Sequence, residues 1–277
     1  MTAPTRVAIL QMTAGIDPAE NASTIVAAAE RSAGEGAAML FTPEMSGLLD
    51  RDRQRAAAHV VPEAENPVLD NACEAARRCG LWIALGSLAV AREDGRWVNR
   101  SLLIDPHGKV AARYDKIHMF DVDLASGESW RESSAYAPGD AVVAAATPLG
   151  RLGLTVCYDI RFPALYEELG RLRCDALAIP AAFTVPTGQA HWHLLQRARA
   201  VEASAWAIAA AQTGRHADGR ETYGHSLVID PWGAVVLDMG LEPGLGFAVI
   251  DPARTAEVRA QLPSLANRRE IPRSNGQ

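Results

Sequence analysis

The sequence has 277 residues, of which 48% are hydrophobic and 22% charged, the balance of a folded protein with a sizeable core. The net charge of −6 and the lack of a broad basic stretch exclude nucleic acid as an expected partner. No apolar run has the length of a signal peptide core or of a membrane span, so we expect no membrane association and a cytoplasmic location. We find no linker and expect one domain over residues 1–277, with an extended tail at about 268–277.

Short apolar runs alternate with helical patterns in two separate series along the chain. In the first series, strands are predicted at 7–11, 38–42 and 81–88, and helices at 18–33 and 66–79. In the second, strands are predicted at 152–156, 176–179 and 206–211, and helices at 163–172 and 189–203. This alternation is typical of strands separated by helices that cover a sheet.

A similar segment follows each series. Residues 101–110 read SLLIDPHGKV and residues 226–235 read SLVIDPWGAV. Each predicts a hairpin, because Asp-Pro-x-Gly supplies the fixed φ of proline and the positive φ that glycine tolerates. Asp-Pro-x-Gly is also a common turn on its own. The repeat favours two related halves, with two sheets packed face to face and helices outside.

Cys157 has a position in the sequence suited to a nucleophile. It ends a predicted buried strand, and Pro163, close behind it, is a suitable first residue of a helix. Backbone N–H groups near a helix start can favour a thiolate and an oxyanion. From this segment alone, a buried structural cysteine is an equal alternative. The other cysteines, Cys73, Cys79 and Cys174, are spread along the chain and do not predict a disulfide framework.

Two charged residues follow predicted strands in the same way. Glu44 lies in the turn Pro43-Glu44-Met45-Ser46-Gly47, where an apolar strand would partly desolvate it and suit it to be a general base. Lys116 leaves the first hairpin, and an ammonium beside a glutamate and a cysteine would stabilise an oxyanion. Taken singly, each residue is more often an exposed surface charge.

The order Glu44, Lys116, Cys157, with its surrounding motifs, resembles the nitrilase or carbon–nitrogen hydrolase superfamily. The motifs are Pro-Glu at 43–44, Tyr-Asp-Lys-Ile-His at 114–118 and Cys-Tyr-Asp-x-Arg-Phe-Pro at 157–163. The resemblance extends from about residue 7 to 269. It implies an α/β fold, a four-layer α-β-β-α sandwich of two related halves, and a homodimer or larger homo-oligomer.

The resemblance also implies further site residues. Glu132 matches a supporting acidic residue, and the Tyr158 backbone N–H would help Lys116 to hold the oxyanion. Arg161 would bind a substrate carboxylate, although a structural ion pair with Glu167, Glu168 or another acid is an equal alternative. Phe183, in a motif typical of the Nit branch, is assigned to the substrate pocket.

The predicted function is therefore a cysteine-dependent amidohydrolase that acts on a small amide through a thioester and needs no cofactor. Within the Nit branch, Gly-Arg-His at 214–216 favours cleavage of deaminated glutathione to α-ketoglutarate and Cys-Gly. The alternatives are an ω-amidase on α-ketoglutaramate-type acids, another aliphatic amidase or nitrilase, and a catalytically silent binding module.

We predict no metal site and no dinucleotide site. His191 and His193 lie in one predicted helix, where an H-x-H pair points to different faces. Gly244-Leu-Gly246 lacks the continuation of a dinucleotide motif.

Overall fold

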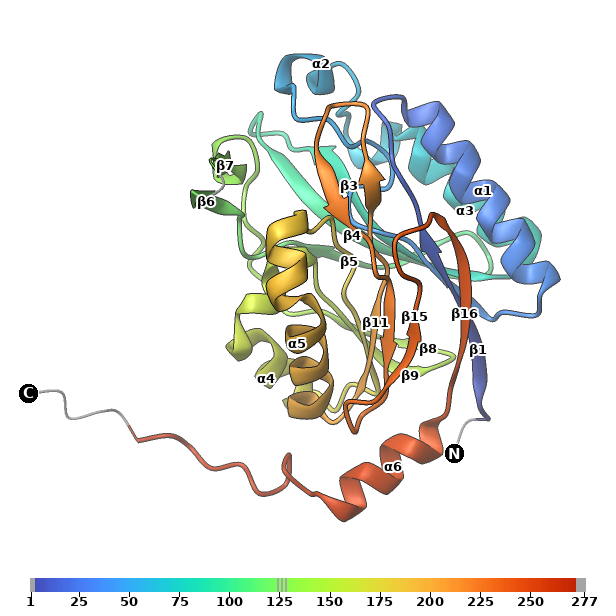
Figure 1. The fold of residues 1–277 in the computed structure, drawn as a ribbon. Helices are drawn as coiled ribbons and strands as arrows, with labels where there is room; N and C mark the ends of the chain where they lie inside the picture. The colour runs from blue at the N-terminus through green and yellow to red at the C-terminus, as the bar shows by residue number, and fades with distance from the viewer. Residues whose placement is uncertain (1–2, 124, 126, 128, 273–277) are drawn as a thin grey trace, which may run out of the picture.

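The protein is described by a computed structural model that covers residues 3–123, 125, 127 and 129–272. Its centre is a pair of six-stranded sheets (Figure 1). In spatial order, the first sheet contains β16 (Gly244–Ile250), β1 (Thr5–Gln11), β2 (Met39–Phe41), β3 (Trp82–Ala91), β4 (Trp97–Ile104) and β5 (Val110–Asp115). The second contains β15 (Val235–Asp238), β14 (Leu227–Ile229), β11 (Trp206–Ala209), β10 (Ala176–Ala178), β9 (Gly150–Leu154) and β8 (Ala144–Thr147).

Helices cover the outer faces of both sheets (Figure 1). The first sheet carries α1 (Pro18–Gly34) and α3 (Pro67–Cys79), and the second carries α4 (Pro163–Arg171) and α5 (Val185–Ala203). The predicted four-layer α-β-β-α sandwich is therefore confirmed.

The two sheets repeat one topology, as the internal repeat in the sequence predicted. In the first sheet β1, β2 and β3 are parallel, with β4 and β5 following as an antiparallel hairpin and β16 antiparallel to β1. The second sheet has β9, β10 and β11 parallel, then β14 and β15, with β8 antiparallel to β9.

The two predicted hairpins are formed by the same contacts. Asp105 accepts backbone N–H groups from His107 and Lys109 at 2.8 and 2.9 Å. Asp230 accepts those of Trp232 and Ala234 at 2.9 and 2.8 Å. The glycine of each turn has a positive φ, +76° at Gly108 and +87° at Gly233. A register shift also occurs at the equivalent point in each hairpin, between Leu103 and Ile104 and between Val228 and Ile229.

The apolar core fills the spaces between the layers. Along β1, Val7 and Ile9 are buried against the second sheet, and the alternate residues Ala8 and Leu10 are buried against α1 and α3. This alternation follows from the two-residue period of a strand. Both faces of β1 are covered, which explains why its sequence is an uninterrupted apolar run.

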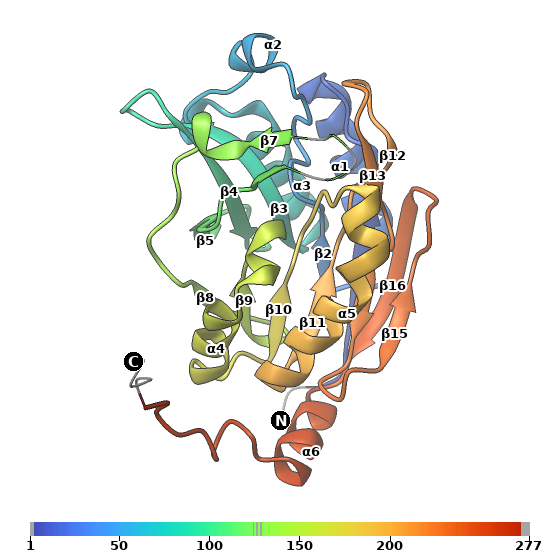
Figure 2. The ribbon, with the colours of Figure 1, turned by 60° about the vertical axis from the view of Figure 1, so that its left-hand side comes forward.

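Smaller elements gather at the end of the sandwich where the parallel strands finish (Figure 2). They are α2 (Arg53–Ala57), the ribbon of β6 (Asp121–Asp123) and β7 (Ser129–Arg131), and the ribbon of β12 (Thr213–Arg215) and β13 (Glu221–Tyr223). The 3-10 helices found among the described residues are η1 (Glu63–Glu65), η2 (Glu132–Ser134) and η3 (Cys157–Arg161). The last helix, α6 (Pro252–Gln261), lies at the opposite end (Figure 1).

One helix begins earlier than the sequence predicted. We expected it to start at Gln189, but α5 begins at Val185, because Pro186 lies in its first turn, where no N–H is needed. Gly188 allows this turn to pack on Tyr223: an added Cβ would lie 2.2 Å from the Tyr223 ring.

The extended tail expected at about 268–277 stays a prediction. Residues 268–272 form neither helix nor strand, and 273–277 lie outside the described residues. Arg268 nevertheless bonds to the backbone oxygens of Glu167 and Glu202, at 2.8 and 3.1 Å. Of the helices described, none is long and apolar enough to cross a membrane.

Candidate active site

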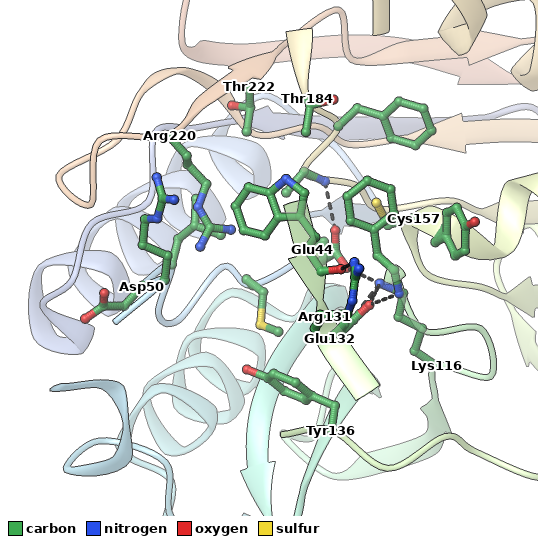
Figure 3. Close-up of a pocket in the computed structure, with 18 of the residues that line it drawn as sticks. Glu44, Asp50, Lys116, Arg131, Glu132, Tyr136, Cys157, Thr184, Arg220 and Thr222 are labelled. Atoms are coloured by element: carbon green, nitrogen blue, oxygen red, sulfur yellow. Dashed lines mark hydrogen bonds and ion pairs between the residues drawn. The ribbon is translucent and has the colours of Figure 1, made fainter. Parts of the chain in front are cut away.

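A pocket at the carboxyl ends of the parallel strands contains the three residues singled out in the sequence. Glu44 follows β2, Lys116 directly follows β5, and Cys157 opens η3 after β9. Glu132, at the start of η2, lies in the same pocket (Figure 3). The first half of the chain thus supplies the charged groups, and the second half supplies the thiol.

Lys116 lies between the two glutamates. Its Nζ is 3.0 Å from Glu44 Oε1 and 2.8 Å from Glu132 Oε2 (Figure 3). The Lys116 side chain is only 2% exposed. Burial would lower the pKa of Lys116, but the charges of Glu132 and Glu44 hold it well above its usual value. The ammonium is therefore charged at neutral pH and faces the pocket.

Both carboxylates are fixed by further hydrogen bonds. Asn99 on β4 donates to Glu44 Oε1 at 2.9 Å and to Glu132 Oε1 at 3.2 Å. The Ala182 N–H donates to Glu44 Oε2 at 2.9 Å, and the Phe120 N–H donates to Glu132 Oε2 at 2.7 Å. Sequence analysis missed Asn99, although it lies directly across the predicted hairpin from Lys116, whose N–H bonds to the Asn99 carbonyl at 2.9 Å.

Cys157 occupies a sharp turn between β9 and η3. Its φ is +49°, which is uncommon for a residue other than glycine, and its N–H donates to the Pro180 carbonyl at 2.8 Å. Burial raises the pKa of the Cys157 thiol well above its usual value, and the charge of Glu44 raises it further. The predicted turn is present, whereas burial and the nearby Glu44 carboxylate disfavour the thiolate that the sequence suggested.

The turn that carries Glu44 is bonded to an irregular part of β3. The β3–β4 register shifts between Leu85 and Leu88, and Gly86 and Ser87 lie in the gap. Ser87 Oγ accepts the Met45 N–H at 2.9 Å, and the Gly86 N–H donates to Thr42 Oγ1 at 3.0 Å. The approach is so close that a Cβ on Gly86 would lie 2.1 Å from the Thr42 carbonyl oxygen.

Comparison with known proteins agrees with this geometry. Residues 6–260 match the family model described as carbon-nitrogen hydrolase. The deaminated glutathione amidase of Yersinia enterocolitica is 39% identical over 271 residues, covering 96% of this chain and 93% of the relative. The chain belongs to the carbon-nitrogen hydrolase family.

Solved structures place the fold in the same family. The NitFhit protein of C. elegans superposes with a TM-score of 0.89 at 34% identity, covering 97% of this chain and 66% of that one. A glutamine-for-glutamate mutant of the amidase from Nesterenkonia sp. AN1 has a TM-score of 0.81 at 26% identity, covering 97% of this chain and 95% of that one. That structure shows the acetamide moiety of fluoroacetamide added covalently at the active-site cysteine. A cysteine nucleophile in this carbon-nitrogen hydrolase is consistent with it.

A second buried carboxylate connects two motifs of this carbon-nitrogen hydrolase. Asp159 in η3 is fully buried and accepts the Val156 N–H at 2.9 Å. It also accepts the Tyr114 hydroxyl at 2.7 Å and the His118 N–H at 3.1 Å, and it bonds to the His118 ring at 2.7 Å. Asp159 therefore ties the cysteine turn to the residues on either side of Lys116. The sequence motifs contain Tyr114, His118 and Asp159, but they do not show that these residues are in contact.

The residues predicted to contact substrate lie on the second-half wall of the pocket. Arg161, Tyr158 and Phe183 all line it. The Arg161 guanidinium lies 5.5 Å from the Phe183 ring centroid and 6.0 Å from that of Tyr158. Its polar contact is with His191 Nδ1 at 3.3 Å.

The alternative partners considered for Arg161, Glu167 and Glu168, pair with Arg171 instead. Among the described residues of this carbon-nitrogen hydrolase, Arg161 has no acidic partner, so its charge faces the pocket.

One group of side chains outside the pocket could accept a metal ion. His193 and His225 both bond to the Asp238 carboxylate, at 3.0 and 2.8 Å, and the ligand atoms lie within 4.8 Å of one another. Within the described ranges no other such group is found. His191 and His193 point to different faces of the helix, as predicted, since His191 bonds to Arg161 and His193 to Asp238. The sequence did not predict that His225 and Asp238 would lie beside His193.

Proposed function

We propose that this amidohydrolase cleaves deaminated glutathione, releasing α-ketoglutarate and Cys-Gly. The observation that carries the proposal is that one pocket contains a buried thiol, a base and a cation. The wall of the same pocket also presents Arg161, which has no acidic partner among the described residues. The Yersinia enterocolitica relative bears the name of this activity. A guanidinium suits the α-keto acid end of such a substrate, because it can bind a carboxylate through two parallel hydrogen bonds.

The proposed reaction begins with transfer of the Cys157 proton to Glu44. As the proton leaves, the sulfur bonds to the amide carbon, and the carbonyl oxygen becomes an oxyanion. Lys116 Nζ and the Tyr158 N–H, in the first turn of η3, are the proposed donors to that oxyanion. Because burial and Glu44 raise the pKa of the thiol, we infer that proton transfer accompanies attack and does not precede it.

The remaining steps return the enzyme to its starting state. The C–N bond breaks as Glu44 gives its proton to the departing amine, which leaves a thioester on Cys157. A water molecule then loses a proton to Glu44 and attacks the thioester carbon. The C–S bond breaks, the acid is released, and Glu44 returns the proton to sulfur. Glu132 and Asn99 are proposed to hold Lys116 and Glu44 in place throughout.

The test is a side-by-side assay of the purified protein with deaminated glutathione and α-ketoglutaramate, following α-ketoglutarate release. Cys157→Ala serves as the blank, since it should keep the fold and lose turnover. A strong preference for deaminated glutathione supports the proposal. A preference for α-ketoglutaramate makes the protein an ω-amidase, and activity in the Cys157→Ala variant contradicts the cysteine mechanism.

A catalytically silent protein with the same fold would behave differently towards a substrate-like electrophile. A working site should direct a chloroacetamide-type reagent to Cys157 before the other three cysteines, because Glu44 would accept the thiol proton as the sulfur attacks. Peptide mapping by mass spectrometry identifies the modified cysteine. Equal labelling of all four cysteines would favour a binding module.

The assembly and location are also proposals. A homodimer or larger homo-oligomer is supported by apolar side chains left exposed on α5, namely Leu194 at 67% and Val201 at 42%. The cytoplasmic location expected from the sequence stays a prediction.

A further inference from the structure

One wall of the pocket is a continuous series of aromatic side chains. The Tyr158 and Phe120 ring centroids lie 5.0 Å apart in an edge-to-face arrangement. Phe120 and Trp130 follow at 6.4 Å. All three residues line the pocket, and Tyr158 is adjacent to Cys157 in the chain. The series therefore begins at the nucleophile and extends away from it.

Each end of this aromatic wall carries positive charge. Arg161 lies at the Tyr158 end. At the other end, the guanidinium groups of Arg220 and Arg51 lie 4.9 and 5.6 Å from the Trp130 ring centroid. Figure 3 shows Arg220 on the far side of the pocket from Cys157.

The far cations are held in place, and only Arg220 has an acidic partner among the described residues. Arg220 Nε bonds to Asp218 at 2.7 Å, and the Asp218 side chain is fully buried. The same Asp218 oxygen accepts the Arg51 N–H at 2.8 Å. Asp50, which also lines the pocket, pairs with Arg55 at 2.6 Å. Within the part of the chain that the structure describes, the Arg51 guanidinium has no acidic partner, so the Asp218 carboxylate pairs with only one of the two arginines.

The position of the thiol divides the pocket into two parts. In the proposed binding mode the carboxylate of the acyl group binds Arg161, and the amine that leaves then extends along Phe120 and Trp130. Two residues of extended peptide span roughly 7 Å. A dipeptide amine attached at the scissile carbon therefore has a length comparable with the 6.4 Å between the Phe120 and Trp130 ring centroids. Such a length would bring its free carboxylate toward the guanidinium groups beside Trp130.

We propose that Arg51 and Arg220, supported on Trp130, form a second carboxylate site that binds the end of the leaving amine. This inference rests on the proposed function and narrows it. The substrate class becomes amides with an anionic group at both ends, an α-keto acid on the acyl side and a peptide carboxylate on the amine side. Ammonia as leaving group makes no use of this site.

The experiment compares three compounds that share the α-ketoglutaryl group. They are deaminated glutathione, its analogue with the terminal carboxylate replaced by a carboxamide, and α-ketoglutaramate. The wild type should prefer the carboxylate over the carboxamide by about 10- to 100-fold in kcat/KM, the size expected for lost charge-assisted hydrogen bonds. The preference should weaken as salt is added.

Variants assign that preference to the two arginines. Arg51→Gln and Arg220→Gln should lower kcat/KM for deaminated glutathione toward the carboxamide value and leave α-ketoglutaramate within about 2-fold. Arg220→Lys keeps a charge beside the buried Asp218 and shows whether any loss comes from misfolding. Arg96→Gln, an exposed surface arginine paired with Asp94, is the matched control and should change nothing.

The outcomes separate this inference from the proposed function. Equal cleavage of the carboxylate and carboxamide compounds, or variants that slow all three substrates alike, would overturn the second site and leave the proposed activity standing. Cleavage of α-ketoglutaramate alone would overturn both.

Discussion

Charge balance within the pocket explains how the thiol can remain unionised and still react. One ammonium, on Lys116, faces the two carboxylates of Glu44 and Glu132. Ionising Cys157 in the resting site would add another negative charge to a buried cluster that is already negative. This is why the pKa of the thiol is raised by burial and by Glu44. In the proposed mechanism a base that accepts the proton during attack removes the difficulty, because the developing charge passes to the oxyanion beside Lys116.

The Glu44→Gln variant should therefore change reactivity and turnover in opposite ways. Removing the charge of Glu44 lowers the pKa of Cys157, so alkylation by a small neutral reagent should reach its midpoint at a lower pH than in the wild type. Turnover should fall by roughly 10²- to 10⁴-fold, because the base is lost. Alkylation rates from pH 6 to 11, with Cys157→Ala subtracted, measure the shift. A midpoint that moves to higher pH would contradict the assigned role of the charge.

At the scale of elements, the sequence predicted which strand ends carry the site but not how they are joined. Alternating apolar runs located the parallel strands, and the motifs identified Glu44, Lys116 and Cys157 as residues that follow strands. Asn99 could have been found from hairpin register, because it lies opposite Lys116. The contacts of Asp159 could not, since Tyr114 on β5 and His118 just after it are far from Asp159 in the sequence, and local sequence does not encode that contact.

Asp159 should matter for both stability and rate. Asp159→Asn turns one acceptor oxygen into a donor that faces other donors, so we expect a loss of about 2 kcal/mol or more and a lower kcat. Tyr114→Phe removes one donor and should cost about 1 kcal/mol. The control is Tyr166→Phe, which removes a buried hydroxyl bonded to Thr155 at 3.1 Å and should destabilise without lowering kcat. Urea unfolding and initial rates test the set. An Asp159→Asn enzyme with normal kcat would exclude a positioning role.

Gly86 should be intolerant of a side chain because the Glu44 turn packs directly on it. A Cβ there would lie 2.1 Å from the Thr42 oxygen and 2.2 Å from the Pro43 oxygen, and neither backbone atom can move without moving Glu44. Gly86→Ala should destabilise the fold by roughly 1–3 kcal/mol and reduce kcat. Gly34→Ala, where nothing lies within 4 Å, is the matched control and should be neutral or slightly stabilising. Thermal melting and kinetics measure both, and equal behaviour of the two variants would argue against this packing.

At the scale of the whole molecule, the two halves repeat a topology but divide the chemistry between them. The first half supplies Glu44, Lys116 and Glu132, and the second supplies Cys157 and Arg161, so the pocket requires both sheets. The internal repeat in the sequence indicated the architecture because both turns have the same Asp-Pro-x-Gly chemistry. The repeat did not indicate which half supplies which site residue, because that depends on single side chains at the strand ends. The assignment of residues 1–277 to one domain stays a prediction.

The exposed apolar side chains of α5 provide the last prediction. Leu194 and Val201 belong to the helix that covers the second sheet, and their exposure in a single chain favours burial against another copy. Sedimentation of the wild type should give a dimer or larger species. Replacing both residues with glutamate should reduce the mass, since two charges would then have to enter the contact without partners. Leu241→Glu, at a residue 62% exposed elsewhere on the surface, should leave the mass unchanged. A wild type that sediments as a monomer across micromolar concentrations would show that this face of α5 remains in contact with solvent.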